Sequence, residues 1–185
     1  MKFLLKCISL ILFCSFSASL IQSNFGKVDV SSMKLPTDNG QHLVFDLYKP
    51  NSATSKNKAP FIIVVPGFQR SKEALSNIAI ELSRRGMVVA LIDPYAQGLS
   101  SSSRSKRAAT TQGYGMFALV ELAHTGNFLN YIDINKIAST GHSMGGNAAI
   151  RGANYFGKQA IKNNEPSMLH SVFVSGYVLT LLDDV

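Results

Sequence analysis

One serine has neighbours that could make it a nucleophile. Ser143 lies between Gly141 and Gly145 in the segment GHSMGG, which follows the strand-like segment KIAST and precedes a helix-like segment. This arrangement predicts a sharp turn from a strand into a helix, with the serine side chain projecting from the turn. Glycine is needed at both flanking positions because the strand and the helix pass too close there for side chains. We therefore expect Ser143 to attack a carbonyl carbon.

The start of the helix after Ser143 could stabilise the charge that such an attack creates. The positive end of a helix dipole favours negative charge beside it. We expect the backbone N–H of Met144 to point at the developing oxyanion. The alternative is that Ser143 is one serine in an ordinary glycine-rich turn.

The serine turn lies in a chain that alternates between apolar strand-like segments and amphipathic helix-like segments. Alternation of this kind predicts an α/β sheet with helices on both faces. A strand, a helix and a strand in succession also imply parallel pairing through a right-handed crossover. The expected buried strands are residues 61–65, 87–93 and 171–176, and residues 136–140 form the strand before Ser143. The expected helices are residues 71–86, 113–131 with an interruption at Gly126, and 145–156, the last of them closed by Gly157.

A hairpin is expected before these segments. Residues 27–35 and 41–50 are strand-like and flank the turn signal PTDNG, which predicts an antiparallel pair at the entry to the sheet. No internal repeat and no long linker divides the chain that follows. With 46% hydrophobic and 16% charged residues, the chain has the composition of one globular domain.

The N-terminal segment has the composition of a secretory signal. Two lysines precede an apolar run at residues 7–16, and small residues follow at plausible cleavage positions. We interpret residues 1–19 as a signal peptide and residues 20–185 as the mature domain, located in the periplasm or outside the cell. The apolar run is shorter than the roughly 20 residues that span a bilayer, so we expect no stable membrane span after signal removal. An uncleaved N-terminal anchor is the alternative.

The mature chain carries a modest positive charge and no cysteine. The formal net charge is +7, and removing residues 1–19 takes away both cysteines and two lysines and leaves +5. Without cysteine the mature chain has no disulfide and no thiolate metal site.

One serine-rich segment concentrates positive charge, with Arg104, Lys106 and Arg107 and no interleaved aromatic residues. We therefore expect a solvated loop and no nucleic acid partner. A contact with an anionic substrate or surface is the alternative.

Three motifs of the chain are similar to those of a known superfamily. They are VVPGF at residues 64–68, IDPYAQGLS at residues 92–100 and GHSMGG at residues 141–146. On these motifs the chain resembles the α/β-hydrolase superfamily, and most of all the branch of serine esterases that contains dienelactone-hydrolase-like and cutinase-like enzymes. The resemblance implies the α/β-hydrolase fold, a mostly parallel sheet with helices on both faces. Dienelactone hydrolases typically use a cysteine where this chain has Ser143, so dienelactone itself is not an expected substrate.

The resemblance also implies roles for individual residues. Ser143 matches the nucleophile, Met144 the first oxyanion donor, and Phe68 the second oxyanion donor through its backbone N–H. The Phe68 side chain would form part of the acyl pocket, although an ordinary apolar residue at a strand end is the alternative. The resemblance implies no metal and no organic cofactor, and the expected partner is a small-molecule or polymeric ester. Asp93, at the end of its strand, is expected to hold the following loop.

A serine nucleophile needs a base, and no histidine of the chain is expected in a suitable place. In the superfamily the order is serine, acid, histidine, and only His170 follows Ser143. His170 precedes a strand and so lies at the amino edge of the sheet, whereas Ser143 projects from the carboxyl edge. The other histidines are expected to be surface or packing residues: His42, His124 and His142. Asp183 and Asp184 are the candidate acids, with a solvated tail as the alternative.

These patterns predict a secreted serine hydrolase that acts on carboxylic esters through an acyl-enzyme on Ser143. Because the superfamily domain commonly needs roughly 250 residues, we expect the C-terminal part of the fold, with the triad histidine, to be missing from this chain. One alternative is a non-catalytic exported remnant or binding protein with the same fold. Another is acyl transfer or peptide cleavage at the same serine, since the fold and the nucleophile do not choose the substrate.

Overall fold

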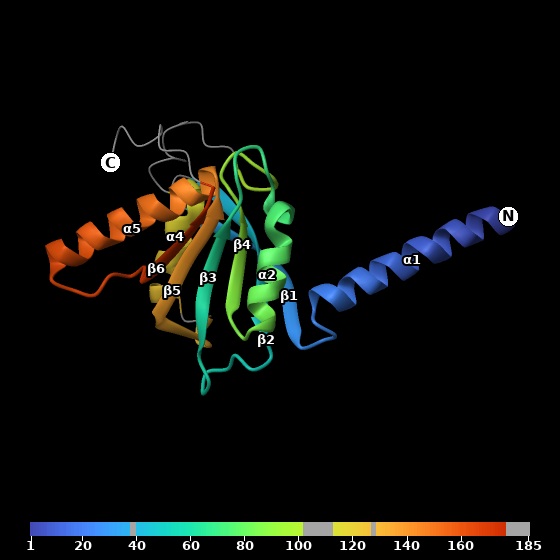
Figure 1. Ribbon diagram of the computed structural model, residues 1–185, viewed down its shortest axis with the longest axis horizontal. Helices are drawn as coiled ribbons and strands as arrows, with labels where there is room; N and C mark the ends of the chain where they lie inside the picture. Colours follow the sequence, from blue (N-terminus) through green and yellow to red (C-terminus); the bar gives the residue numbers. More distant parts are fainter. Residues whose placement is uncertain (38–39, 102–112, 127–128, 177–185) are drawn as a thin grey trace.

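A six-stranded mixed sheet forms the centre of the protein in a computed structural model, which describes residues 1–37, 40–101, 113–126 and 129–176 (Figure 1). The spatial order of the strands is β1-β2-β4-β3-β5-β6. Strand β2 pairs antiparallel with both β1 and β4, and β4, β3, β5 and β6 run parallel to one another. The strands are β1 (Val28–Thr37), β2 (Gln41–Pro50), β3 (Ala59–Val65), β4 (Val88–Asp93), β5 (Ile132–His142) and β6 (Ser171–Ser175). The expected hairpin and the mostly parallel sheet are thus confirmed.

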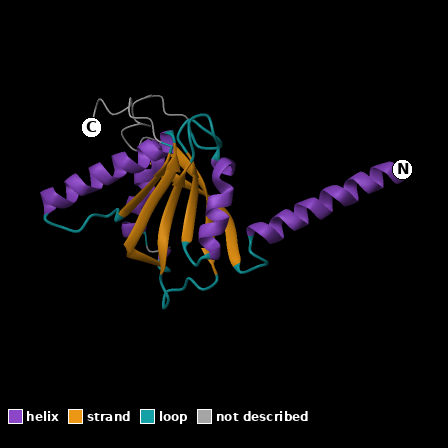
Figure 2. Ribbon diagram, in the orientation of Figure 1, coloured by secondary structure: helices purple, strands orange, loops and turns teal. Residues whose placement is uncertain are grey.

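Helices cover both faces of this sheet, as Figure 2 shows. Helix α2 (Ser76–Arg84), which follows the short 3-10 helix η2 (Lys72–Leu75), packs through Ala79 on one face. Helix α4 (Met116–Thr125), preceded by η3 (Gly113–Gly115), and helix α5 (Met144–Asn163) pack on the other face. The fold class expected from the sequence, α/β with helices on both faces, is confirmed.

The two central strands are buried on both faces. In β3, Ile63 belongs to the core beneath α4 and α5, and its neighbour Val64 belongs to the core beneath α2. All six residues of β4 are buried. Burying each large aliphatic side chain contributes roughly 1.5–3 kcal/mol, so these strands form a rigid platform. The loops that leave β3 and β4 at the carboxyl edge start from this platform.

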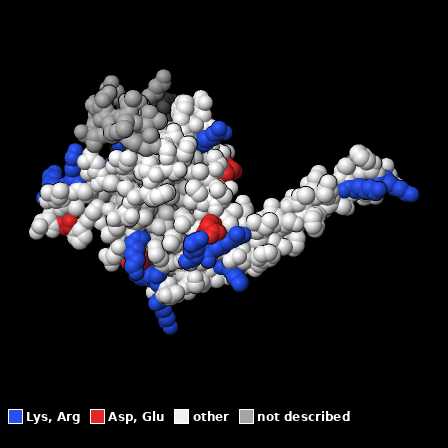
Figure 3. All heavy atoms as spheres, viewed as in Figure 1, with Lys and Arg blue, Asp and Glu red and all other residues white. Residues whose placement is uncertain are grey.

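The N-terminal apolar segment forms one long helix, α1 (Lys2–Gln22), which projects away from the sheet (Figure 1). None of its residues is buried, and Figure 3 shows charged side chains only at its N-terminal end. The apolar run of residues 7–16 lies within this helix, which has 21 residues and a length of about 31 Å at 1.5 Å per residue. It is the one helix among the described residues that is long and apolar enough to cross a membrane. It is also compatible with a signal peptide.

Two helices differ in length from the expectation. Helix α5 does not end at Gly157 but continues to Asn163, and Asn164 ends it in the left-handed conformation (φ 55°). Gly157 does not adopt a positive φ, so it continues the helix and does not end it. Helix α4 covers only part of the expected residues 113–131 and ends at the expected interruption, since the backbone is extended at Gly126 (φ −88°, ψ 112°).

Strand β6 is not buried on both faces as expected. Alternate residues of the strand are exposed, and Phe173 as a residue is 71% exposed. Phe173 lies in an apolar groove of about 530 Å³ on the α2 face of the sheet. The other apolar side chains of this groove are Ile62, Leu75, Ile78, Leu82, Met87 and Ala138.

Two sets of residues from the sequence analysis lie outside the described residues. They are the basic segment with Arg104, Lys106 and Arg107, and the candidate acids Asp183 and Asp184.

Candidate active site

Ser143 is the single residue between β5 and α5. Its backbone has φ 55° and ψ −115°, a conformation that a residue with a side chain rarely adopts and that costs of order 1–3 kcal/mol. The Ser143 N–H donates a hydrogen bond to the carbonyl of Gly176 (2.8 Å), and the Ser143 carbonyl accepts one from the N–H of Asn147 (3.0 Å). The structure therefore has the strained strand–turn–helix geometry of a nucleophile elbow.

Three backbone segments meet at this turn. A Cβ atom on Gly145 would collide with the carbonyl group of Val65, at the end of β3. A Cβ atom on Gly141 would lie 2.6 Å from the carbonyl oxygens of both Val65 and Gly145. Side chains at either glycine would therefore push β3, β5 and α5 apart, and the absence of side chains allows the close approach.

Backbone N–H groups of two elements lie near Ser143. Met144 is the first residue of α5, so its N–H is one of those that find no partner inside the helix. On the other side, an ideal Cβ atom on Gly67 would lie 3.4 Å from Ser143 Cβ, which places the loop after β3 directly against the serine. Phe68 follows Gly67 in this loop, and 68% of the residue is exposed. The N–H groups of Met144 and Phe68 are thus on elements that border Ser143.

Two of the four histidines lie far from Ser143, one because of strand order and one because it is at the opposite edge of the sheet. His42 begins β2 and its Nε2 contacts the carbonyl oxygen of Leu99 (3.1 Å). Strands β2 and β5 are three positions apart in the sheet, or about 14 Å at the usual strand spacing. His170 lies at the amino edge, where its N–H donates to the carbonyl of Ile137 (2.9 Å). Neither histidine can accept a proton from Ser143.

The other two histidines lie against backbone groups. His124 Nε2 lies 3.0 Å from the carbonyl oxygen of Met168. The His142 ring lies between two glycines, because ideal Cβ atoms on Gly67 and Gly176 would be 3.5 Å from Nδ1 and 3.0 Å from Nε2. Among the described residues, no hydrogen bond joins the side chain of Ser143 to a histidine.

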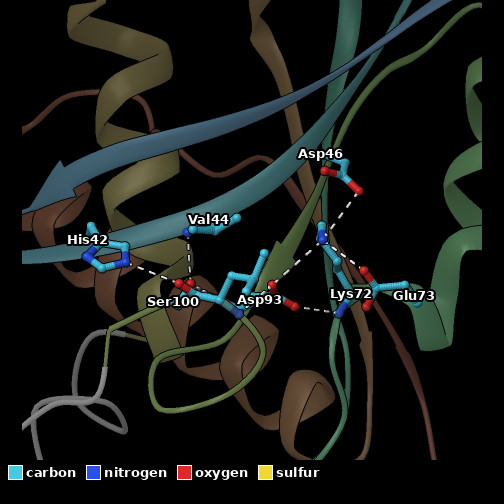
Figure 4. Close-up of polar contacts among 8 residues, drawn as sticks. His42, Val44, Asp46, Lys72, Glu73, Asp93 and Ser100 are labelled. Carbon is cyan, nitrogen blue, oxygen red and sulfur yellow. Dashed lines mark hydrogen bonds and ion pairs between the residues drawn. The ribbon is translucent and has the colours of Figure 1, made fainter.

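Asp93 ties two loops together at the carboxyl edge (Figure 4). Its side chain is almost fully buried, Oδ1 accepts a hydrogen bond from the backbone N–H of Lys72 (2.7 Å), and Oδ2 accepts one from Leu99 (3.0 Å). A Cβ atom on Gly98 would collide with this carboxylate, so the loop after β4 also wraps closely around it. The expectation that Asp93 holds the following loop is confirmed, and the loop after β3 is held as well.

Lys72 is a buried cation that the sequence analysis missed. Only 6% of the residue is exposed, and its Nζ lies 2.8 Å from Glu73 Oε1, 3.7 Å from Asp46 Oδ2 and 3.8 Å from Asp93 Oδ2 (Figure 4). Burial lowers the pKa of Lys72, but the hydrogen bond to Glu73 and the charges of Asp46 and Asp93 outweigh burial and raise it above 10.5. The hydrogen bond from Lys72 lowers the pKa of Glu73 from 4.5 to about 2. We call these four residues the Lys72 cluster.

A shallow pocket lies between the two loops that Asp93 joins. It has a volume of about 460 Å³ and is lined by residues 68–71 and 96–98. Arg70 supplies its cation, and the side-chain amide of Gln97 is buried without a hydrogen-bond partner. In the described part of the chain, no group of three His, Cys, Asp or Glu residues could hold a metal ion.

Solved structures with the same fold define the class of the protein. An α/β hydrolase, GrgF, from Penicillium sp. sh18 matches with a TM-score of 0.62 and 19% identity over 80% of this chain and 46% of its own. A bacterial heroin esterase (TM-score 0.61, 18% identity) covers 86% of this chain and 49% of its own, and a hyperthermophilic esterase from Pyrobaculum calidifontis (TM-score 0.57, 22% identity) covers 84% and 48%. The protein is an α/β-hydrolase by fold, and it spans less than half the length of these structures.

The family is shown by a sequence-family model. The family described as "PETase: PET hydrolase-like" matches residues 15–182, which is most of the chain. The chain therefore belongs to the PET hydrolase-like family, and the resemblance to the serine-esterase branch of the superfamily is confirmed. No curated protein matches the chain.

Proposed function

We propose that the protein is a serine hydrolase that cleaves carboxylic esters through an acyl-enzyme on Ser143. The observation that carries this proposal is the strained backbone of Ser143 at the first turn of α5. Strain of this kind persists where the surrounding structure enforces it, and a serine at a turn between a strand and the start of a helix is suited to present its hydroxyl to a substrate. Membership of a family described as PET hydrolase-like supports an ester as the substrate.

The reaction would proceed in two steps. Ser143 Oγ attacks the ester carbonyl, and the N–H groups of Met144 and Phe68 stabilise the oxyanion while the alcohol leaves with the serine proton. Water then attacks the acyl-enzyme, releases the carboxylic acid and restores the serine. The proton must pass through a base on its way to the alcohol. No described histidine hydrogen-bonds to Ser143, so another group must supply this base.

The substrate side of the proposal rests on exposure at the site. The largely exposed Phe68 side chain supplies the aromatic wall of an open pocket of about 460 Å³, whose other large side chains are polar. Phe68 would contact the apolar part of a small ester or of a polymer such as a polyester, and the polar wall would face its ester groups. We further propose that residues 1–19 are a signal peptide and that residues 20–185 act outside the cytoplasm. The long apolar helix at the N-terminus supports export.

A fluorophosphonate, which reacts with activated serines, tests the catalytic proposal. We expect labelling of the 185-residue chain at Ser143, identified by mass spectrometry, and its loss in Ser143→Ala. Ser175→Ala is the matched control, because Ser175 is exposed at the same edge and its backbone carbonyl lies 3.3 Å from the Ser143 nitrogen. Absence of Ser143-dependent labelling in the folded chain would contradict the proposal.

The second candidate is a non-catalytic protein that binds an ester. The observation that favours it is the lack of a histidine hydrogen-bonded to Ser143 among the described residues. Saturable binding of an ester ligand that is unchanged by Ser143→Ala, without labelling of the wild-type chain, would support this candidate over the first.

A further inference from the structure

The loop that carries Phe68 contains a tight and strained turn. The N–H of Arg70 donates a hydrogen bond to the carbonyl of Gly67 (3.2 Å), and Gln69 adopts a positive φ of 55° between them. A left-handed backbone at a residue with a side chain costs roughly 1–2 kcal/mol. Phe68, Gln69 and Arg70 are all exposed, so their own side chains bury little surface that could hold the turn. The turn must therefore be held at its two ends.

The first end of the turn is fixed by the sheet. Gly67 follows directly on β3, which is paired with β4 on one side and β5 on the other. The same glycine lies against Ser143 and His142. The position of the loop at this end follows from the strands.

The second end of the turn is fixed by Lys72. Its backbone N–H is bonded to Asp93, at the end of β4, and its Nζ lies within ion-pair distance of Asp46 on β2 and of Asp93. One residue thus attaches the loop to two strands through both its backbone and its side chain. Because the side chain is buried and its charge is balanced by carboxylates, moving it would leave unpaired buried charges, which is costly.

We propose that Lys72 is a positioning residue that holds the Phe68 N–H in place as an oxyanion donor for Ser143. The proposal rests on the proposed function, since it assigns a purpose to the geometry of the loop. Lys72 does not touch the reacting atoms. It acts through the turn between Gly67 and Arg70, which has no other described anchor at its second end than the Lys72 backbone and the Lys72 cluster.

Two measurements on the full chain test this role. The first is hydrogen exchange of the Arg70 amide, which reports the turn and needs no activity, with the Asn147 amide as the reporter of the elbow. The second is the rate of fluorophosphonate labelling, separated into the binding constant and the maximal labelling rate. The variants are Lys72→Met, which keeps the length of the side chain but removes its charge, and Arg85→Met as a control. Arg85 is exposed and pairs with Glu81 at 2.8 Å.

We expect Lys72→Met to lower the maximal labelling rate at least roughly tenfold, because losing one oxyanion donor typically costs more than this. Exchange at Arg70 should also become at least roughly tenfold faster, because the loop loses the buried ion pairs at its second end and opens more often. The Asn147 amide and the binding constant should stay the same, and Arg85→Met should change none of these values. A purely structural role would instead speed exchange at both amides equally. Wild-type exchange at Arg70 in folded Lys72→Met, or equal acceleration at Asn147, would overturn the proposal.

Two further outcomes remain decisive. If Lys72→Met does not fold, Asp46→Asn is the second variant, because it weakens the same anchor. It should speed exchange at the Arg70 amide about threefold and leave exchange at the Asn147 amide unchanged. No effect at Arg70 would overturn the role of Lys72. If wild-type Ser143 is not labelled, the proposed function fails, and the exchange measurements alone decide whether Lys72 holds the turn.

Discussion

The Oδ1 atom of Asp93 lies 2.7 Å from the backbone nitrogen of Lys72 and accepts its hydrogen bond. The other carboxylate oxygen, Oδ2, accepts a hydrogen bond from the N–H of Leu99 (3.0 Å). The two loops that border the pocket beside Phe68 are therefore bonded to one buried side chain. This relationship makes the stability of the candidate site depend on residues that do not contact Ser143.

Replacing Asp93 by asparagine should strongly destabilise the protein. Asparagine has one acceptor oxygen in place of two, so one backbone N–H loses its partner, and Lys72 loses a buried counter-charge. We expect the free energy of unfolding to fall by about 2–4 kcal/mol, measured by urea denaturation. Asp29→Asn is the control, because Asp29 is exposed and 4.0 Å from Lys49, and a change below about 1 kcal/mol is expected there. Equal effects of the two substitutions would contradict this account.

Alanine should have opposite effects at two glycines of α5. In Gly145→Ala the new Cβ collides with the carbonyl group of Val65, and we expect a loss of about 3 kcal/mol or failure to fold. In Gly157→Ala the new Cβ meets nothing within 4 Å, and higher helix propensity should stabilise the protein by about 0.5–1 kcal/mol. Urea denaturation of the two variants measures both values. A neutral Gly145→Ala would mean that α5 and β3 are not in close contact.

The strained backbone of Ser143 predicts that glycine stabilises this position more than alanine does. Both Ser143→Gly and Ser143→Ala remove the hydroxyl, but only glycine adopts a positive φ without steric cost. We expect Ser143→Gly to be more stable than Ser143→Ala by about 1–3 kcal/mol in thermal or urea unfolding. Both variants should fail to react with a fluorophosphonate. Equal stability would show that the turn is not strained in solution.

The ion pair between Lys72 and Glu73 predicts a loss of stability in acid. The pKa of Glu73 is lowered from 4.5 to about 2 in the folded protein, so the unfolded chain binds its proton at higher pH. Stability from this pair is present above about pH 4.5 and is lost as the pH falls toward 2. Glu73 is 67% exposed at its side chain, so screening limits the effect to under about 1 kcal/mol. Glu73→Gln should flatten this part of the stability curve, and an unchanged curve would contradict the pairing.

The strands and the serine turn could be predicted because their signals are local. The apolar run before Val65 is short, β-branched and continuous, which is typical of a strand buried on both faces, and the structure has β3 there. The glycines around Ser143 likewise report a close approach of backbones. Gly157 was misread because glycine inside a helix and glycine at its end have the same sequence signal.

The Lys72 cluster could not be predicted from the sequence for the opposite reason. Lysine at the start of an expected amphipathic helix is normally exposed. Its partners Asp46 and Asp93 are 26 and 21 positions away in the chain and come from strands whose neighbours are fixed only by the order of the sheet. The burial of Phe173 was overestimated for a similar reason, since an apolar strand does not reveal what covers each of its faces.

The apolar groove around Phe173 also affects how the solubility of the protein depends on salt. Its exposed apolar lining favours association between molecules in water, while the net positive charge makes separate molecules repel one another. At 0.1 M salt the repulsion is screened at distances beyond about 10 Å, whereas the apolar attraction remains. Concentrated solutions should therefore be clearest at low ionic strength and turn cloudy as salt is added.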